Sequence, residues 1–99
     1  MIDVKWTEPA LSDLRAIRDY IAKDSVYYAE KVVDEALDKT DDLGMWPDMG
    51  RKVPEENDPT IREIIHCSYR IIYQTFPTHV NILTVIHGKQ EYTTPEGIS

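Results

Sequence analysis

The sequence predicts an α+β fold in which an N-terminal strand is followed by an antiparallel helical hairpin and a three-stranded antiparallel meander. Its first residues alternate apolar and polar side chains, which is the period of a strand. Two stretches then repeat apolar residues at helical spacing, and three later runs are rich in β-branched and aromatic residues. This order of elements favours one antiparallel sheet with the hairpin packed on one face.

The first strand and the first helix are predicted from the residues on either side of Thr7. Residues 2–6 read IDVKW, so their apolar side chains fall on one face of a strand. Thr7 is a favourable N-cap, and Pro9 stands in the first helical turn, where it loses no hydrogen bond. Apolar residues then recur every three or four positions, so a helix is expected over residues 8–23.

The second helix is predicted to begin after Asp24 and Ser25, which are residue types that cap helices well. Its apolar stripe continues to about Leu43, and Gly44 follows in the place of a capping glycine. Because the link between the two helices is short, we expect them to be antiparallel neighbours.

The second half of the chain predicts a long loop and three strands. Residues 44–60 contain three prolines and two glycines without a sustained period, which indicates a loop that crosses back over the fold. A polar tail from Gln90 is expected to be loosely held, and residues 1–99 are expected to form a single domain. The three strands are expected at residues 61–66, 69–76 and 80–87.

The simplest register of the two hairpins divides the side chains of these strands between two faces. The more apolar face should meet the helices, and Glu63 on that face counts against the assignment. The residues expected to face the helices are Ile61, Ile65, Tyr69, Ile71, Tyr73, Val80, Ile82 and Ile86, and those expected on the opposite face are Arg62, Ile64, His66, Arg70, Asn81 and His87.

The charge of the chain narrows the classes of partner. Its 99 residues include 11 basic and 18 acidic side chains, which gives a net charge of −7. This balance disfavours non-specific binding to nucleic acid or to anionic membranes, and no direct sequence-specific binding of nucleic acid is expected.

The expected location follows from the cysteine content and from the apolar runs. Cys67 is the single cysteine, so an internal disulfide is excluded. No stretch has the pattern of a signal peptide or the length of a transmembrane helix. The sequence therefore predicts a cytoplasmic protein without membrane contact.

Several segments, which together span nearly the whole chain, match one family. They are the opening VKWTEPALSDL, the loop WPDMGRKVPE, the segment IREI, and SYRIIY followed by VIHGK. The combination of YRIIY and VIHGK at this spacing is the most specific of them. On these segments the sequence resembles the RelE/ParE superfamily of bacterial toxins from type II toxin–antitoxin systems.

The resemblance implies one of two activities. ParE-like members act on DNA gyrase and leave it stalled on cleaved DNA, a role associated with plasmid stabilization. RelE-like members enter the ribosomal A site and cleave mRNA with the help of basic residues that grip the phosphates. Both branches share one fold, so the fold does not decide between gyrase and the ribosome as target.

A RelE-like nuclease needs cations at the scissile phosphate and a group that exchanges a proton near neutral pH. Arg70 matches the phosphate-binding arginine of that branch, but two expected lysines are Ile61 and Glu63 here, and a later arginine is Gln90. The net charge also opposes docking in the ribosome. A non-catalytic, ParE-like gyrase inhibitor is therefore favoured. In the nuclease alternative, the residues that act are Arg70, His87, Lys89 and Tyr92.

The resemblance also implies a cognate antitoxin, which binds in a hetero-oligomeric complex through a C-terminal segment that folds on binding. Its acidic side chains are expected to meet Arg51, Arg62 and Arg70. An equal alternative for Arg70 is a structural role, in which its guanidinium pairs with Glu63 or with a loop acid. A third alternative for the whole chain is a binding module that keeps the fold and has lost toxicity.

Cofactors and metals find no support in the sequence. It contains no phosphate-binding loop and no dinucleotide fingerprint, so no cofactor is assigned. Four residues that bind metals in other proteins lack the paired spacing of a zinc site, so no metal is assigned either. These four are His66, Cys67, His79 and His87. We also expect Cys67 to be a partly buried thiol and the pair Trp46-Pro47 to pin the long loop to the helices.

Overall fold

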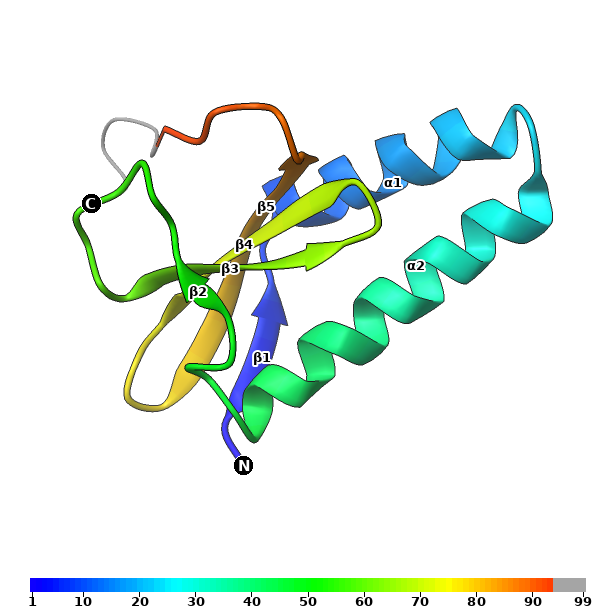
Figure 1. Cartoon of the computed structure of the whole chain (residues 1–99). Helices are drawn as coiled ribbons and strands as arrows, with labels where there is room; N and C mark the ends of the chain where they lie inside the picture. The colour runs from blue at the N-terminus through cyan, green and yellow to red at the C-terminus, as the bar shows by residue number, and fades with distance from the viewer. Residues whose placement is uncertain (94–99) are drawn as a thin grey trace.

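A computed structural model describes residues 1–93, which form a five-stranded sheet with a helical hairpin on one face (Figure 1). The tip of the hairpin projects beyond the strands in this view. Residues 94–99 of the predicted tail lie outside the described residues. The elements are β1 (Asp3–Trp6), α1 (Glu8–Ala22), α2 (Val26–Asp41), the 3₁₀ turn η1 (Asp42–Gly44), β2 (Arg51–Lys52), β3 (Ile61–His66), β4 (Tyr69–Thr75) and β5 (His79–His87).

The strands lie in the order β1-β5-β4-β3-β2, and one of the pairings is parallel. β1 runs parallel to β5, from Asp3 opposite His79 to Trp6 opposite Ile82. The predicted helical hairpin and meander are confirmed, but the prediction of a purely antiparallel sheet is wrong. Local sequence patterns identify strands, and they carry no signal for the pairing of two strands that lie at opposite ends of the chain.

Side chains cap both helices at the predicted positions. The Thr7 hydroxyl oxygen accepts a hydrogen bond from the Ala10 amide at 3.4 Å, and the Ser25 oxygen accepts one from the Tyr28 amide at 3.1 Å. The Thr7 hydroxyl also donates to the Ile82 carbonyl oxygen at 2.7 Å. The residue that begins α1 therefore also ties this helix to β5.

Gly44 has a different role from the predicted one. α2 ends at Asp41, and Gly44 closes the 3₁₀ turn that follows. The Gly44 carbonyl accepts a hydrogen bond from the Ile2 amide at 2.9 Å, and a Cβ atom on Gly44 would lie only 2.7 Å from the Ile2 carbonyl oxygen. The glycine is therefore required by the close approach of the N-terminal residues to this turn.

The main core lies between the hairpin and the sheet. Small residues on the helices allow the backbones to approach, and branched or aromatic residues of β4 and β5 fill the space below them. Leu43 of η1 is completely buried in the same cluster. The buried members are Ala10, Leu14, Ala36, Leu43, Ile71, Tyr73, Val80, Ile82 and Val85.

The predicted faces of β3 are wrong. His66 lies opposite Tyr69, and Ile64 lies opposite Ile71, so these β3 residues share the helix side of the sheet with their partners. His66 Nε2 is 3.1 Å from the Val32 carbonyl oxygen of α2. The two-residue turn at Cys67 and Ser68 makes His66 and Tyr69 direct partners, so both side chains point to the same face of the sheet. The prediction places them on opposite faces. On β3, Arg62, Ile64 and His66 therefore belong to the helix side, whereas Ile61, Glu63 and Ile65 belong to the outer face.

A bulge in β5 causes the second error in the predicted faces. Tyr73 pairs with Ile82, whereas Ile72 pairs with Thr84, so Leu83 is an extra residue on β5. Beyond it the alternation is reversed, which turns Val85 and His87 toward the helix side and Ile86 toward the outer face.

Asp13 of α1 accepts hydrogen bonds from β5 residues next to the bulge at Leu83. Its carboxylate accepts a hydrogen bond from the Thr84 hydroxyl and another from the Val85 amide, the second at 3.1 Å. The helix thus satisfies backbone and side-chain donors next to the bulge.

The outer face of the sheet carries a second apolar cluster, which includes the first residues of the predicted tail. Val53, Ile61, Ile72 and Tyr92 are buried in it, and Tyr92 is 6% exposed. The sequence predicts a loosely held tail from Gln90, but the structure packs the segment around Tyr92 against the sheet.

Tyr73 fastens the loop before β2. The side chain is fully buried, and its hydroxyl donates to the Pro47 carbonyl at 2.8 Å and accepts from the Gly50 amide at 2.9 Å. Trp46 is 64% exposed, so the prediction that it pins this loop is wrong. The hydroxyl of the buried Tyr73 side chain fastens the loop instead.

Replacing Gly50 with alanine is expected to lower the free energy of unfolding by about 1–3 kcal/mol, because the space beside it is full. A Cβ atom there would lie 2.4 Å from the Glu63 carbonyl oxygen and 2.7 Å from the Tyr73 hydroxyl. Urea denaturation measures the effect. Gly88→Ala is the matched control, since its nearest contact would be 3.1 Å, and equal losses in both variants would contradict the argument.

None of the helices within residues 1–93 combines the length and the apolar character that a membrane span requires.

Candidate functional site

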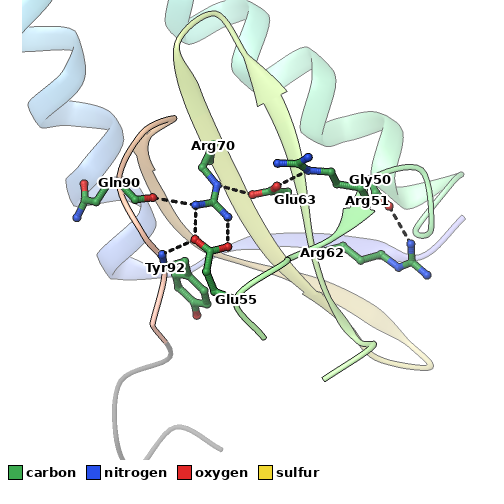
Figure 2. A network of polar contacts seen from close by, with 8 residues as sticks. All are labelled: Gly50, Arg51, Glu55, Arg62, Glu63, Arg70, Gln90 and Tyr92. Atoms are coloured by element: carbon green, nitrogen blue, oxygen red, sulfur yellow. Dashed lines mark hydrogen bonds and ion pairs between the residues drawn. The ribbon is translucent and has the colours of Figure 1, made fainter. Parts of the chain in front are cut away.

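Arg70 of β4 is the centre of a polar network on the outer face of the sheet (Figure 2). Only 4% of the residue is exposed. Its Nε donates to Glu63 Oε1 at 2.5 Å, and its two terminal nitrogens donate to the Glu55 carboxylate at 2.7 and 2.8 Å. The predicted structural role, in which Arg70 pairs with Glu63 or a loop acid, is confirmed, because it pairs with both.

Glu63 of β3 is a buried carboxylate between two arginines. Its side chain is fully buried, and its second oxygen accepts a hydrogen bond from Arg51 Nε of β2 at 2.5 Å. The Arg51 side chain remains 64% exposed. A buried carboxylate without such partners is strongly unfavourable, so the two arginines account for the presence of Glu63 in an otherwise apolar face.

The network also holds the segment after β5. The Gln90 carbonyl accepts a hydrogen bond from Arg70 at 2.8 Å, and the Tyr92 amide donates to Glu55 at 3.0 Å. Figure 2 shows Glu55 between Arg70 and this segment. Arg70 and Glu55 therefore fasten residues 90–92 and the loop after β2 to the same point on the sheet.

The charged groups of this network shift one another's pKa values. Hydrogen bonds from Arg70 and from the Tyr92 amide lower the pKa of Glu55 from 4.5 to about 2. The hydrogen bonds of Glu55 in turn raise the pKa of Arg70, and Glu63 adds to this shift. Both groups are therefore charged at neutral pH.

Glu55 makes the stability of the fold dependent on pH. Because its folded pKa of about 2 lies below the ordinary 4.5, its contribution is complete above pH 4.5 and is lost as the pH falls from about 4.5 to 2. We expect Glu55→Gln to be less stable than the wild type at pH 7 and to show a flatter pH dependence in this window. Urea denaturation at several pH values measures both. Glu35→Gln on the exposed side of α2 is the control, and an unchanged slope in Glu55→Gln would contradict the prediction.

Arg62 lies apart from this network. Its Nη1 donates to the Gly50 carbonyl at 2.8 Å, and its Nε lies 3.4 Å from an Asp48 carboxylate oxygen. These contacts support the loop before β2. The three arginines predicted to bind an antitoxin thus differ in exposure: Arg70 is buried, Arg62 is partly buried and Arg51 is largely exposed.

The residues of the nuclease alternative are divided between the two faces of the sheet. His87 ends β5 on the helix side, where its ring meets Tyr69 edge-on with the ring centres 6.0 Å apart. Tyr92 lies in the outer apolar cluster, on the side of Arg70. Lys89 follows in an exposed turn, where its amide donates to His87 Nδ1 at 3.3 Å. The structure brings Tyr92 near Arg70 and separates both from His87.

Cys67 differs from its prediction as a partly buried thiol. It occupies the turn between β3 and β4 with a φ of 55° and is exposed. Its Sγ lies 3.7 Å from His66 Nε2, although neighbours on a strand point apart, because the turn backbone redirects the side chain. Within residues 1–93 no three metal-binding side chains come together.

The sequence predicts a loop acid as a partner of Arg70 and does not identify it as Glu55. Glu55 lies between two prolines in a segment without period, and 15 positions separate it from Arg70. Glu63, a charged residue inside an apolar strand, indicates a buried cationic partner, which is Arg70, and carries no signal for Glu55.

Comparison with known proteins identifies the family to which this chain belongs. The family model for the ParE toxin of the type II toxin–antitoxin system parDE matches residues 4–92. The chain belongs to the ParE toxin family. This membership confirms the resemblance to the RelE/ParE superfamily, and the match includes every helix and all strands from β2 to β5.

Relatives of this ParE-family toxin carry names from both branches. It is 34% identical to the Toxin RelE2 of Caulobacter vibrioides over 89 residues, which are 89% of this chain and 97% of the relative. The solved chromosomal ParDE system from P. aeruginosa has a TM-score of 0.73 at 23% identity, with 88% of this chain and 96% of that chain covered. RelBE2 from Mycobacterium tuberculosis has a TM-score of 0.63 at 21% identity, with 87% and 96% covered. The two structures support the fold.

Proposed function

We propose that this ParE-family toxin poisons DNA gyrase by binding it and that a cognate antitoxin neutralises it in a hetero-oligomeric complex. The solved relatives named ParDE and RelBE2 are toxin–antitoxin systems, which supports the antitoxin as partner. The family model is that of the toxin of parDE, which supports the ParE-like branch.

The state of Arg70 is the main observation in favour of a binding poison. The resemblance places this arginine at the position of the phosphate-binding residue of RelE-like nucleases. Here it donates hydrogen bonds to Glu55, Glu63 and the Gln90 carbonyl. Stabilising a phosphate at a transition state needs a donor directed at that phosphate. A guanidinium that is buried and already makes four hydrogen bonds within the protein favours an activity that does not depend on it chemically.

A supercoiling assay with purified gyrase tests the proposal. We expect the toxin to reduce supercoiling and to cause cleaved DNA to accumulate, and we expect addition of the antitoxin to prevent both effects. Absence of both effects, with a protein that still stops cell growth, would refute gyrase as the target. A protein that binds the antitoxin and leaves both gyrase and growth unaffected would instead be the binding module that has lost toxicity.

The second candidate is a RelE-like, ribosome-dependent mRNA endonuclease, which is favoured by the name of the Caulobacter relative. In that case Arg70, His87, Lys89 or Tyr92 would carry the chemistry. Cleavage of mRNA on purified ribosomes by the wild type, and its loss in His87→Ala with the fold intact, would establish this candidate.

A further inference from the structure

Three large apolar side chains are exposed on the loop between α2 and β2. Trp46 is 64% exposed, Met45 is 53% exposed and Met49 is 49% exposed. They line an open hollow of about 480 Å³ at the surface. Tryptophan and methionine are enriched where proteins bind one another, and exposed apolar side chains gathered in one place mark such surfaces.

Met1 extends this surface. The N-terminus lies beside the end of α2 (Figure 1), where the Ile2 amide donates to the Gly44 carbonyl at 2.9 Å. A Cβ atom on Gly44 would lie 3.1 Å from Met1 Cγ, so the Met1 side chain lies against the turn that precedes Met45. Met1 is 92% exposed, and all three methionines of the chain belong to this surface. We call Met1, Met45, Trp46 and Met49 the methionine–tryptophan patch.

The backbone beneath this patch is held by hydrogen bonds. The Trp46 amide donates to the Asp42 carbonyl at 2.9 Å, and the Met49 amide donates to the Trp46 carbonyl at 3.0 Å. The buried Tyr73 hydroxyl donates to the Pro47 carbonyl between them. A loop that is already ordered loses little conformational entropy when it binds a partner. The fold thus presents these side chains to solvent in a fixed arrangement.

Exposed acidic side chains adjoin the patch. Residues 34–49 contain six acids and one lysine. Asp38, Asp41 and Asp42 stand exposed at the end of α2, immediately before the patch, and none of the three forms a salt bridge within residues 1–93. Negative charge at the C-terminal end of a helix is unfavourable for the helix, so helix stability does not account for these acids. They suit a partner with a basic surface.

This charge selects among the possible occupants of the patch. The aspartates repel anionic membranes and nucleic acids, and a second copy of the chain, with its own charge of −7, brings the same groups. The antitoxin is expected to bring acidic side chains, which suit arginines and not aspartates. Gyrase holds DNA, and a protein that holds DNA uses lysine and arginine to neutralise the phosphates. A basic surface of gyrase is therefore the occupant that complements this region.

We propose that the methionine–tryptophan patch is the surface by which the toxin binds gyrase. Its apolar side chains pack against apolar groups of that enzyme, while Asp38, Asp41 and Asp42 pair with lysine or arginine side chains at the rim of the contact. None of the residues of the nuclease alternative belongs to this patch. The inference rests on the gyrase target of the proposed function and specifies which surface binds it.

Potency against gyrase tests the apolar part of the patch. The assay combines purified gyrase, plasmid DNA and the full-length toxin, and it gives the toxin concentration that halves supercoiling. We expect Trp46→Ala to raise this concentration about tenfold or more, because large aromatic side chains contribute most at interfaces. Tyr27→Ala is the matched control, since Tyr27 at the hairpin tip is 77% exposed, and it should change the concentration less than about twofold. Circular dichroism verifies that both variants are folded.

Removal of two charges tests the acidic rim. Asp41→Asn combined with Asp42→Asn should slow association with gyrase about threefold or more at low salt and make the rate less sensitive to salt, because charges steer the encounter. Surface plasmon resonance measures this rate. Asp24→Asn combined with Glu30→Gln removes two exposed acids near the other end of α2 and should leave the rate unchanged. Equal slowing in both double variants would show an effect of net charge alone and would overturn the role of the rim.

The outcomes separate this inference from the proposed function. A weakened Trp46→Ala that still binds the antitoxin with wild-type affinity in titration calorimetry supports the inference. A wild-type toxin that poisons gyrase, with Trp46→Ala equally potent, would overturn the inference and leave gyrase as the target. Loss of antitoxin affinity in Trp46→Ala with unchanged potency would overturn it as well and assign the patch to the antitoxin. A wild-type toxin without effect on gyrase would overturn the proposed target together with this inference.

Discussion

Arg70→Ala is expected to lower the free energy of unfolding by about 3–5 kcal/mol, because it removes the main partner of a buried carboxylate. The Glu63 side chain is fully buried, and without Arg70 it keeps only Arg51, which is largely exposed. Glu55 loses both hydrogen bonds from Arg70, and the Gln90 carbonyl loses its donor, at the same time. Urea denaturation followed by circular dichroism gives the loss.

A double variant separates the buried charge from the lost packing. In Arg70→Met combined with Glu63→Met, both buried charges are replaced by apolar side chains of similar length. We expect this variant to be more stable than Arg70→Ala, because the fully buried carboxylate of Glu63 has been removed together with its partner. Arg70→Ala within 1 kcal/mol of the wild type would contradict the structural role of this arginine. Loss of toxicity in Arg70→Ala is therefore evidence for a nuclease only when the variant is shown to be folded.

Tyr73→Ala is expected to have a similarly large effect, a loss of about 3–5 kcal/mol in the free energy of unfolding. The side chain is fully buried in the core between hairpin and sheet, and its truncation leaves a cavity there. Tyr73→Phe keeps the ring and removes only the hydroxyl that joins Pro47 and Gly50, so we expect it to cost about 1–3 kcal/mol.

Hydrogen exchange distinguishes these two losses. In Tyr73→Phe the Gly50 amide has lost its acceptor, so it should exchange faster, while the amides of α1 should keep their rates in native conditions. Equal rates at Gly50 in wild type and Tyr73→Phe would contradict the role of the phenol as the anchor of the loop.

The elements of the fold were predictable from the sequence because their signals are local. Thr7 and Ser25 cap the two helices as predicted, and the three long strands lie within one residue of their expected bounds. The faces of the strands were not predictable in the same way. The turn at Cys67 and the bulge at Leu83 each reverse the alternation, and both depend on backbone geometry rather than on hydrophobic pattern.

The candidate site was predictable only in part. Arg70 and Glu63 belong to strands, so the sequence singles out both as charged residues in apolar runs. Glu55 and the exposed Trp46 belong to the long loop, where no period relates a residue to its surroundings. Their positions are set by contacts with residues distant in the chain, which local patterns do not encode.

Because β1 pairs with β5, a newly synthesised chain can complete its sheet only after β5 has been made. Thr7 and Ile82, whose contact fastens the start of α1 to β5, are 75 positions apart. The ribosome releases the hairpin first, and its apolar stripes stay uncovered until β4 and β5 have emerged. Contacts that span most of a chain also slow folding. A product that terminates early, before His79, therefore lacks both the partner of β1 and much of the core, and it would be cleared as an unfolded polypeptide rather than accumulate as a partial poison.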